Sequence, residues 1–257
     1  MVFKYLPMSI RESDAENYSD SVNNSKMISD IRDLLLKDSS EEAQKRANSV
    51  QNWAESRIRE FWFSRMVILK LLQQEQTQQL EQPEQPIIFS DLNIVSNRSL
   101  KEFPNYLVSI SHTTGMVVSG IANVNDIFAF GLDIERADRR FSENTERMFK
   151  NKFDDDKLEL IKLWISKEAA YKALDPVIKT IIHADNPHFA ETFDLKKIWI
   201  RARSKSSSSD YSFGICDKER QSLQIGFVEL ALIRNLDKGV RYYFAKATIS
   251  KRFSLLL

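Results

Sequence analysis

The chain has 257 residues, of which 42% are hydrophobic, so it can bury a sizeable core as one large domain or two small, closely packed ones. Its 37 Lys and Arg residues are balanced by 36 Asp and Glu residues, which excludes an overall basic field that would steer the whole molecule to nucleic acid. The single cysteine, Cys216, excludes an internal disulfide and a cysteine-built zinc site, and no apolar run approaches membrane-spanning length. Because the acid-rich N-terminus is also unlike a secretion signal, we expect a soluble cytoplasmic protein without nucleic-acid or membrane partners.

Residues 1–48 are polar, and we interpret them as a loosely attached extension with at most one short amphipathic helix, around Met27 to Leu36. Residues 54–74 then carry apolar side chains at helical spacing, which predicts a long helix. The Gln-rich stretch at residues 71–86 ends in a Pro-rich segment and predicts a low-complexity loop.

Strand-like runs follow at residues 87–95, 106–111 and 116–122, and a His-Thr-Thr-Gly turn joins the last two into a hairpin. We therefore predict an N-terminal lobe at residues 49–126, made of one long helix and antiparallel strands.

A C-terminal lobe at residues 127–257 is expected to follow the same plan. Its predicted helices and strands are the strand 128–135, the helices 142–149 and 157–174, and the strands 196–202, 224–234 and 240–249. The serine run within residues 205–210 predicts a mobile loop. The expected fold class is α+β, although a duplicated architecture is suggested only by the order of elements and by no visible sequence repeat.

The strand at residues 128–135 alternates strictly between apolar and small or acidic side chains. Asp133 and Glu135 therefore leave one face of the strand together, behind Ala129 and Gly131. The small residues predict room for a ligand beside the acids, and a hard cation such as Mg²⁺ would relieve the repulsion between the two carboxylates. The alternative is an acidic strand surface that faces solvent.

Three further side chains share one stripe of the helix at residues 157–174. Trp164, Glu168 and Lys172 lie at i, i+4 and i+8, so a carboxylate and an ammonium group point from the same face. An ordinary surface Glu-Lys pair with a core Trp is the alternative. Ser111 and His112 end a strand before a Gly-containing turn, where they could face an anion or serve a structural role.

The order and spacing of these motifs resemble those of the phosphopantetheinyl transferases, specifically the longer two-lobed type that acts on carrier proteins. The resemblance rests on the strand that ends in Ser111-His112, on Gly-Leu-Asp-Ile-Glu at 131–135 and on Trp-Ile-Ser-Lys-Glu-Ala-Ala-Tyr-Lys at 164–172. A weaker match is the helix in which Arg65 precedes an apolar run. The resemblance extends from about Ser56 to the final strands.

The resemblance implies a pseudo-twofold pair of α+β lobes, each with antiparallel strands packed on a long helix, and coenzyme A bound in the cleft between them. The implied reaction moves the 4'-phosphopantetheine arm of coenzyme A to a serine of an acyl or peptidyl carrier protein and releases adenosine 3',5'-bisphosphate. Such a two-lobed chain completes its cleft without a second subunit, so we expect a monomer.

The resemblance also implies roles for individual residues. Asp133, Glu135 and Glu168 would hold Mg²⁺ against the pyrophosphate, and Lys172 would neutralise the charge that builds up on the transferred phosphate. Glu168 is a candidate general base, and Asp133 is a further catalytic acid, so the identity of the base stays open. The phosphates of coenzyme A would be held by Lys172 and by a second group of residues, namely Arg65, Ser111, His112 and Lys167.

Three features depart from the family pattern. No Gly-Lys-Pro precedes the Ser-His strand, and no Gly-x-Gly follows Lys172. The additional acid that the family usually carries ahead of the Trp motif has no assigned equivalent among Asp154, Asp155, Asp156 and Glu159. A degenerate member that binds coenzyme A or a carrier protein without catalysis is therefore the main alternative, and an unrelated interaction protein is a second one. The basic segment from Arg136 to Lys152 suggests a docking surface for an acidic carrier, although a solvated charged surface explains it equally well.

Overall fold

The computed structural model describes residues 3–9, 24–79, 86–94, 98–179, 187–203, 210–217, 220–234 and 239–251. The chain divides into two compact units, Val2–Ala122 and a unit made of Met1 and Asn123–Leu257, which we call unit 2 and unit 1. Both units combine helices with antiparallel strands, so the expected α+β class is confirmed. Within the described residues, no helix has both the length and the apolar character that a membrane-spanning segment needs.

Unit 2 contains a three-stranded sheet in the order β1-β3-β2, built from β1 (Phe3–Ser9), β2 (Tyr106–Thr113) and β3 (Met116–Asn123). The predicted hairpin is confirmed, because β2 and β3 are joined by a two-residue turn in which Gly115 has a φ of 80°. Only glycine adopts this left-handed conformation without strain. Ser111 and His112 lie near the end of β2, just before that turn.

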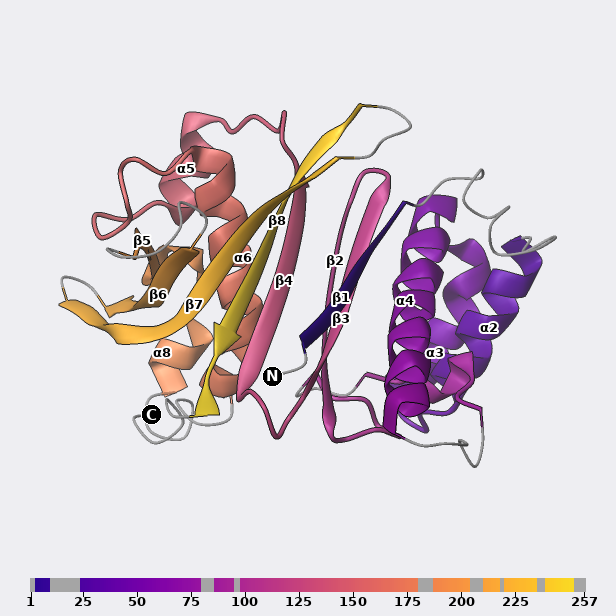
Figure 1. Ribbon diagram of the computed structural model, residues 1–257. Coiled ribbons are helices and arrows are strands. Elements are labelled where there is room, and N and C mark those ends of the chain that lie inside the picture. Colours follow the sequence, from indigo (N-terminus) through magenta and orange to yellow (C-terminus); the bar gives the residue numbers. More distant parts are fainter. Residues whose placement is uncertain are drawn as a thin grey trace. The chain divides into compact units, whose positions relative to one another are not determined.

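The long helix α4 (Glu55–Gln79) packs against this sheet, as expected for residues 54–74. Buried side chains of α4, including Val67 and Leu71, meet Val108 of β2 and Ile121 of β3. On its other side α4 contacts α2 (Asn24–Leu36) and α3 (Glu41–Ser49), so unit 2 has the layers sheet, α4 and a pair of helices (Figure 1).

The N-terminal residues are therefore part of unit 2, which corrects the expectation of a loose extension at residues 1–48. The strand β1 pairs antiparallel with β3 from Phe3↔Ala122 to Ser9↔Met116. Met27 and Ile31 of α2 are buried in a cluster with Trp62, and the Trp62 Nε1–H donates to Asp30 at 2.9 Å. The amphipathic helix expected around Met27 to Leu36 is confirmed as α2, and its apolar stripe is buried in unit 2.

The strand expected at residues 87–95 is absent from its described part, residues 87–94. A short 3₁₀ turn, η2 (Phe89–Asp91), takes its place, and the Ile88 N–H donates to the Asp91 carboxylate at 3.0 Å. Ile87 and Leu92 are buried against α4. A short apolar run thus fills the core from a turn, which periodicity alone does not distinguish from a strand.

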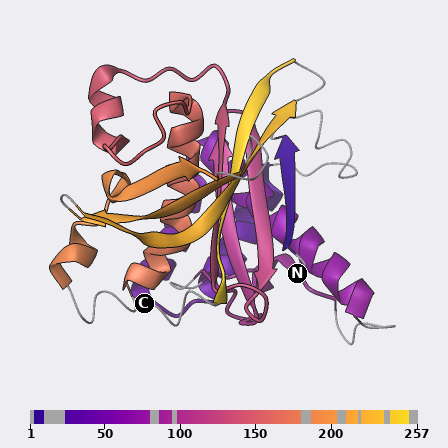
Figure 2. The same ribbon diagram turned by 60° about the vertical axis from the view of Figure 1, so that its left-hand side comes forward.

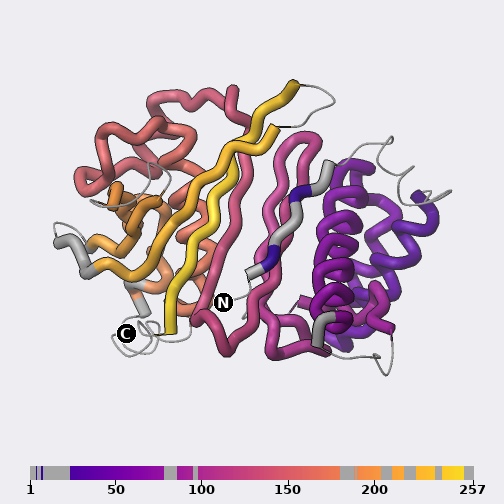
Figure 3. Tube along the Cα trace, in the orientation of Figure 1, coloured from indigo at the N-terminus to yellow at the C-terminus, as the bar shows by residue number. Residues whose placement is uncertain are grey.

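Unit 1 contains a five-stranded antiparallel sheet in the order β4-β8-β7-β6-β5, whose strands are labelled in Figure 1. Its two long C-terminal strands, coloured gold and yellow, run side by side in Figures 2 and 3. The strands are β4 (Ala129–Arg136), β5 (Ile198–Ala202), β6 (Asp210–Asp217), β7 (Arg220–Arg234) and β8 (Arg241–Ile249). All but β6 were expected. The predicted loop at residues 205–210 lies almost wholly outside the described residues, and its last residue, Asp210, begins β6.

The helix α6 (Leu160–Val177) covers one face of this sheet and confirms the expected helix at 157–174 (Figure 1). Its buried Ile165, Ala169 and Ala173 pack with Ala245 and Ala247 of β8. Two shorter helices complete the unit, α5 (Glu143–Phe149) and α8 (Pro187–Glu191), together with the 3₁₀ turn η4 (Leu195–Lys197). The Ser142 hydroxyl caps α5 by accepting the Thr145 N–H at 3.2 Å.

Candidate active site

Helix α6 lies directly against β4 at Gly131. A Cβ atom on Gly131 would come within 2.1 Å of the Ala169 carbonyl oxygen and 2.7 Å of the Ala173 nitrogen, so no larger residue fits there. The sequence suggested that Gly131 leaves space for a ligand beside the acids, and this expectation is wrong. Gly131 lets the backbone of α6 approach the strand, and this approach brings the side chains of α6 to Asp133.

Asp133 and Lys172 form the central contact between the two elements. The Lys172 ammonium lies 2.7 Å from Asp133 Oδ1 and also donates to the Leu132 carbonyl at 3.1 Å. The Asp133 residue is only 5% exposed, whereas the Lys172 side chain remains 19% exposed. An ammonium held at a buried carboxylate, with part of its surface still open, can also meet an incoming anion.

Glu168 lies one helical turn before Lys172 and is partly buried. Burial, and then the nearby Asp133 carboxylate, raise the pKa of Glu168 above its ordinary value, while Lys172 and Arg139 act in the opposite direction. Asp133, Glu168 and Lys172, which the sequence predicted as one site, are thus brought into one electrostatic neighbourhood.

Glu135 is two residues beyond Asp133 on β4 and forms an ion pair with Arg139. The Arg139 guanidinium also lies 4.9 Å from the centroid of the Trp164 ring and 5.1 Å from that of Phe141, within cation–π range. Arg139 was expected only as part of a basic docking segment. Its actual position makes it a cationic neighbour of the site, which the sequence did not reveal because the contact depends on the turn after β4.

The carboxylates of the site can be compared with the ligands that the expected Mg²⁺ needs. Among the residues that the structure describes, no group of three His, Cys, Asp or Glu side chains is arranged to hold a metal ion. Asp133 and Glu168 nevertheless provide two neighbouring carboxylates, and Mg²⁺ commonly binds one or two carboxylates and completes its shell with water and substrate phosphates. The residues present therefore fit a magnesium ion whose remaining positions are filled by water or by the phosphates of a ligand.

Lys167 has a different role from the one that the resemblance implied. It is 0% exposed, and its ammonium lies 2.8 Å from Asp154 Oδ2 in a fully buried ion pair. The same ammonium donates to the carbonyl oxygens of Phe149 and Ile198, each at 2.6 Å. Because the protein already surrounds this charge, we correct the expectation that Lys167 contacts a phosphate of coenzyme A.

The other predicted ligand-binding residues belong to unit 2. Ser111 is buried on β2, whereas the neighbouring His112 side chain is 54% exposed, with its Nδ1 3.4 Å from Glu60 Oε2. The alternation of the strand explains this difference, because successive residues point to opposite faces. Of the two, His112 is therefore the residue whose side chain is accessible to a ligand.

Arg65 lies on α4 with its guanidinium 3.7 Å from the centroid of the Phe61 ring. Its Nη1 donates to the Ser64 hydroxyl at 3.0 Å, and within the described residues its buried Nε makes no hydrogen bond. Burial, with a smaller contribution from Arg46, lowers the pKa of Arg65 to about 9. A desolvated cation of this kind is suited to an anion.

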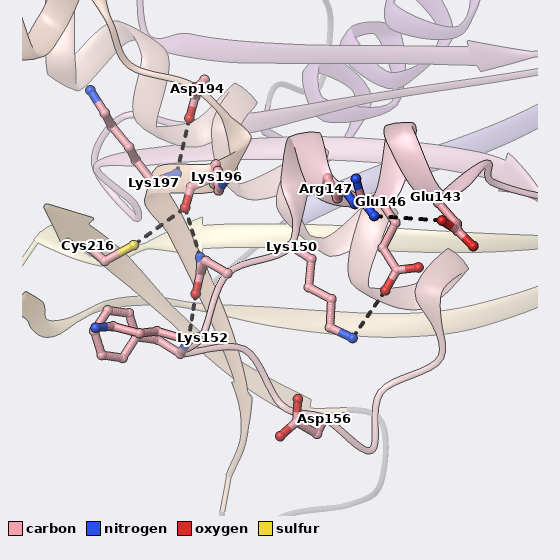
Figure 4. Close-up of a pocket in the computed structure, with 12 residues that line it drawn as sticks. Glu143, Glu146, Arg147, Lys150, Lys152, Asp156, Asp194, Lys196, Lys197 and Cys216 are labelled. Atoms are coloured by element: carbon pink, nitrogen blue, oxygen red, sulfur yellow. Dashed lines mark hydrogen bonds and ion pairs between the residues drawn. The ribbon is translucent and has the colours of Figure 1, made fainter. Parts of the chain in front are cut away.

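A pocket of about 1090 Å³ lies elsewhere in unit 1, between α5, the segment after it, η4 and β6 (Figure 4). None of the predicted catalytic or ligand-binding residues lines it. Much of its charge is already compensated, since Lys150 pairs with Glu146 at 3.2 Å and Arg147 lies 3.8 Å from Glu143. Cys216 is buried at this pocket, and its burial raises the pKa of the thiol.

A comparison with protein-family models finds no match, and a comparison with curated proteins finds no similar sequence.

Proposed function

We propose that the protein transfers the 4'-phosphopantetheine group of coenzyme A to a serine of an acyl or peptidyl carrier protein, with release of adenosine 3',5'-bisphosphate. The observation that carries the proposal is the 2.7 Å contact between Asp133 of β4 and Lys172 of α6, with Glu168 one turn away in the same electrostatic neighbourhood. The transfer of a phosphoryl group needs this combination of carboxylates for a metal and a cation for the phosphate.

We assign Asp133, Glu135 and Glu168 to hold the metal. A magnesium ion held there would supply positive charge at the pyrophosphate. Glu135 is paired with Arg139, so in this proposal Arg139 releases Glu135 when the metal and coenzyme A bind. The motif residues around these acids serve the same arrangement, because Gly131 permits the close approach of α6 that brings Glu168 and Lys172 to the strand.

Lys172 is assigned to the transferred phosphate. Its ammonium is held by Asp133 and by the Leu132 carbonyl, which fixes its position before substrate arrives. Glu168 is the first candidate for the group that accepts the proton of the attacking serine. Its raised pKa brings the carboxylate closer to the range in which a general base works near neutral pH. Asp133, which is committed to Lys172, is the second candidate.

In this proposal the remaining phosphates of coenzyme A bind residues of unit 2. His112 and Arg65 are assigned to them, supported by the exposure of His112 and by the Arg65 guanidinium, which has no acidic partner within the described residues. The side chain of Ser111 is buried, so it is assigned no direct contact. The proposal requires the two units to act as pseudo-twofold related lobes with coenzyme A in a cleft between them, in a cytoplasmic, monomeric enzyme.

The proposed protein partner is an acidic carrier. Support comes from the basic segment after β4, in which Arg140 and Arg147 are exposed. A second candidate function is the binding of coenzyme A or a carrier protein without transfer. The missing Gly-Lys-Pro and Gly-x-Gly motifs favour this alternative.

The experiment that tests the proposal incubates the protein with coenzyme A, Mg²⁺ and a panel of apo carrier proteins from different pathways, followed by mass spectrometry of each carrier. We expect a mass increase of one phosphopantetheine group on a carrier serine. Asp133→Ala and Glu168→Ala should abolish it, whereas Glu159→Ala, at the exposed start of the same helix, should not.

Calorimetric titration with coenzyme A separates the two candidate functions. If no carrier gains mass while coenzyme A binds, the binding protein without catalysis is favoured. If neither transfer nor binding is observed, both candidates fail.

A further inference from the structure

The buried pair of Asp154 and Lys167 is the least expected feature of unit 1. Both side chains are fully excluded from solvent, and the two charged groups lie 2.8 Å apart. Burial alone raises the pKa of Asp154 and lowers that of Lys167, so each charge depends on the other and on the surrounding hydrogen bonds. If these two positions served only to fill the core, two apolar residues of similar size could pack there without the cost of burying charges.

The pair joins four segments of the chain to α6. The Lys167 ammonium donates to Phe149 at the end of α5, to Leu195 of η4 and to Ile198 of β5. Asp154 Oδ1 accepts the Ile200 N–H at 3.1 Å, and its Oδ2 accepts the Asn151 N–H at 2.8 Å. Every polar atom of the pair is thereby directed to a defined partner.

The segment that carries Asp154, residues 151–155, also covers the outer edge of β5, the last strand of the sheet. The Asp155 N–H donates to the Ile200 carbonyl at 2.8 Å, and the Asp155 carboxylate accepts the Ala202 N–H at 3.2 Å. Asn151 adds a hydrogen bond to the Ile198 carbonyl at 2.7 Å. Because these contacts fix the segment to the sheet, Asp154 holds Lys167 against a rigid support.

Lys167 immediately precedes Glu168, and successive residues of an α-helix point about 100° apart around its axis. One side of α6 is therefore attached to β5 through Lys167, while Glu168 and Lys172 point toward Asp133 of β4. A rotation of α6 that carried Glu168 away from Asp133 would also pull the Lys167 ammonium out of its buried contacts. The two attachments together determine the angle at which Glu168 faces the strand.

We infer that Asp154 and Lys167 are positioning residues that hold Glu168 in the orientation needed for metal binding and phosphoryl transfer. This inference rests on the proposed function for its catalytic consequence. Neither residue touches substrate, and both act through the orientation of α6.

The test uses the double variant Lys167→Met/Asp154→Asn, which removes both charges at nearly constant volume and keeps an acceptor for the Ile200 N–H. Near-ultraviolet circular dichroism first establishes that the variant is folded. We then expect the Kd for Mn²⁺ alone, measured by electron paramagnetic resonance, to rise about tenfold or more, as is typical when a residue that orients a metal ligand is lost. In the transfer assay kcat should fall by a similar factor, with the KM for coenzyme A within about twofold of the original value.

The matched control is Lys162→Met/Glu159→Gln, which removes an exposed pair at the start of the same helix whose charged atoms lie 2.6 Å apart. This control should leave Mn²⁺ affinity and kcat unchanged. If the first double variant does not fold, Asp154→Asn alone, which keeps the shape of the site, should still weaken Mn²⁺ binding.

Unchanged Mn²⁺ affinity in a folded variant would overturn the inference. A raised KM for coenzyme A with unchanged kcat would also overturn it, because that result identifies Lys167 as a phosphate contact. If the unaltered protein binds Mn²⁺ but modifies no carrier, the proposed function fails, and the Mn²⁺ measurement still decides whether the pair orients Glu168.

Discussion

Glu168 is a residue whose proposed catalytic role has a cost in folding stability. Its partly buried carboxylate faces the field of Asp133, and both effects raise its pKa. A carboxyl group whose folded-state pKa lies above its unfolded-state value contributes stability below the unfolded pKa, near 4.5, and loses that contribution as pH rises through the folded pKa. At neutral pH the ionised Glu168 therefore destabilises the metal-free protein.

The corresponding prediction concerns Glu168→Gln. In metal-free buffer at about pH 7.5, this variant should be more stable than the parent by about 0.5–2 kcal/mol, the range typical of a single stabilising substitution. Thermal unfolding followed by circular dichroism measures the difference, which should shrink below about pH 4.5, where the parent carboxyl group is protonated.

Two comparisons sharpen this test. Added Mg²⁺ should stabilise the parent and leave Glu168→Gln nearly unchanged, since the variant lacks one of the proposed ligands. Glu159→Gln removes an exposed carboxylate from the start of the same helix and serves as the control. If Glu168→Gln were less stable than the parent at neutral pH, the ionised Glu168 carboxylate would be a stabilising group, and its electrostatic strain would be disproved.

At this scale the sequence predicts part of the site. The alternation along β4 places Asp133 with Glu135 on one face, and the four-residue spacing along α6 places Glu168 with Lys172 on another. These local patterns do not join the two groups. Only the family resemblance does so, and the structure places Asp133 beside Lys172 and near Glu168. The roles of Lys167 and Arg139 depend on partners brought together by the tertiary fold. Adjacent positions in one motif, Lys167 and Glu168, therefore turn out to have opposite surroundings, one enclosed by protein and the other facing the site.

At the scale of elements, hydrophobic periodicity predicts a helix or strand correctly where the element buries one apolar face and exposes the other. The hairpin of β2 and β3 and the start of α4 are predicted close to their observed bounds. The helix α4 continues to Gln79, however, so the loop expected at residues 71–86 is wrong for residues 71–79. Residues 87–94 are different, because their apolar side chains enter the core from a 3₁₀ turn that Asp91 stabilises. The strand β6 was not predicted, because it directly follows a serine run that is typical of a loop.

The helix α2 gives the prediction that belongs to this scale. Ile31 is fully buried in the cluster that α2 shares with α3 and α4, although it lies in a segment of polar composition. Replacing it by alanine removes buried methylene groups and leaves a cavity, so Ile31→Ala should lower the free energy of unfolding by about 2–5 kcal/mol. Urea denaturation followed by tryptophan fluorescence measures this change.

Asp33→Ala, on the exposed side of the same helix, is the control and should change stability by less than about 0.5 kcal/mol. If Ile31→Ala were as neutral as the control, α2 would be a peripheral attachment after all, and residues 1–48 would behave as the loose extension that their composition suggests.

At the scale of the whole molecule, the near balance of charge means that electrostatic recognition has to be local. The net charge is +1, so long-range steering of an acidic partner depends on where cations remain uncompensated. Within the basic segment after β4, Arg136 pairs with Asp138 at 2.6 Å and Arg139 pairs with Glu135. Arg140 is exposed, and Arg147 is 77% exposed with only a loose, 3.8 Å contact to Glu143.

The docking prediction therefore uses Arg140→Glu/Arg147→Glu and spares Arg139, whose replacement would disturb the site itself. For a carrier that the protein modifies, the double variant should raise the carrier KM about tenfold at low ionic strength, with kcat and the KM for coenzyme A unchanged. The difference should narrow as salt is added, because exposed charges are screened within about 10 Å at 0.1 M ionic strength. Steady-state kinetics at several salt concentrations measures both effects.

The control for docking is Lys45→Glu, an equally exposed charge reversal on α3 of the other unit. It changes the net charge by the same amount per residue as each arginine substitution but lies outside the basic segment. If Lys45→Glu raised the carrier KM as much per charge as the arginine variant, recognition would follow net charge and not a local surface. If neither variant altered the carrier KM or its salt dependence, the arginines after β4 would be a solvated surface with no part in docking, and the carrier would have to be recognised through uncharged contacts.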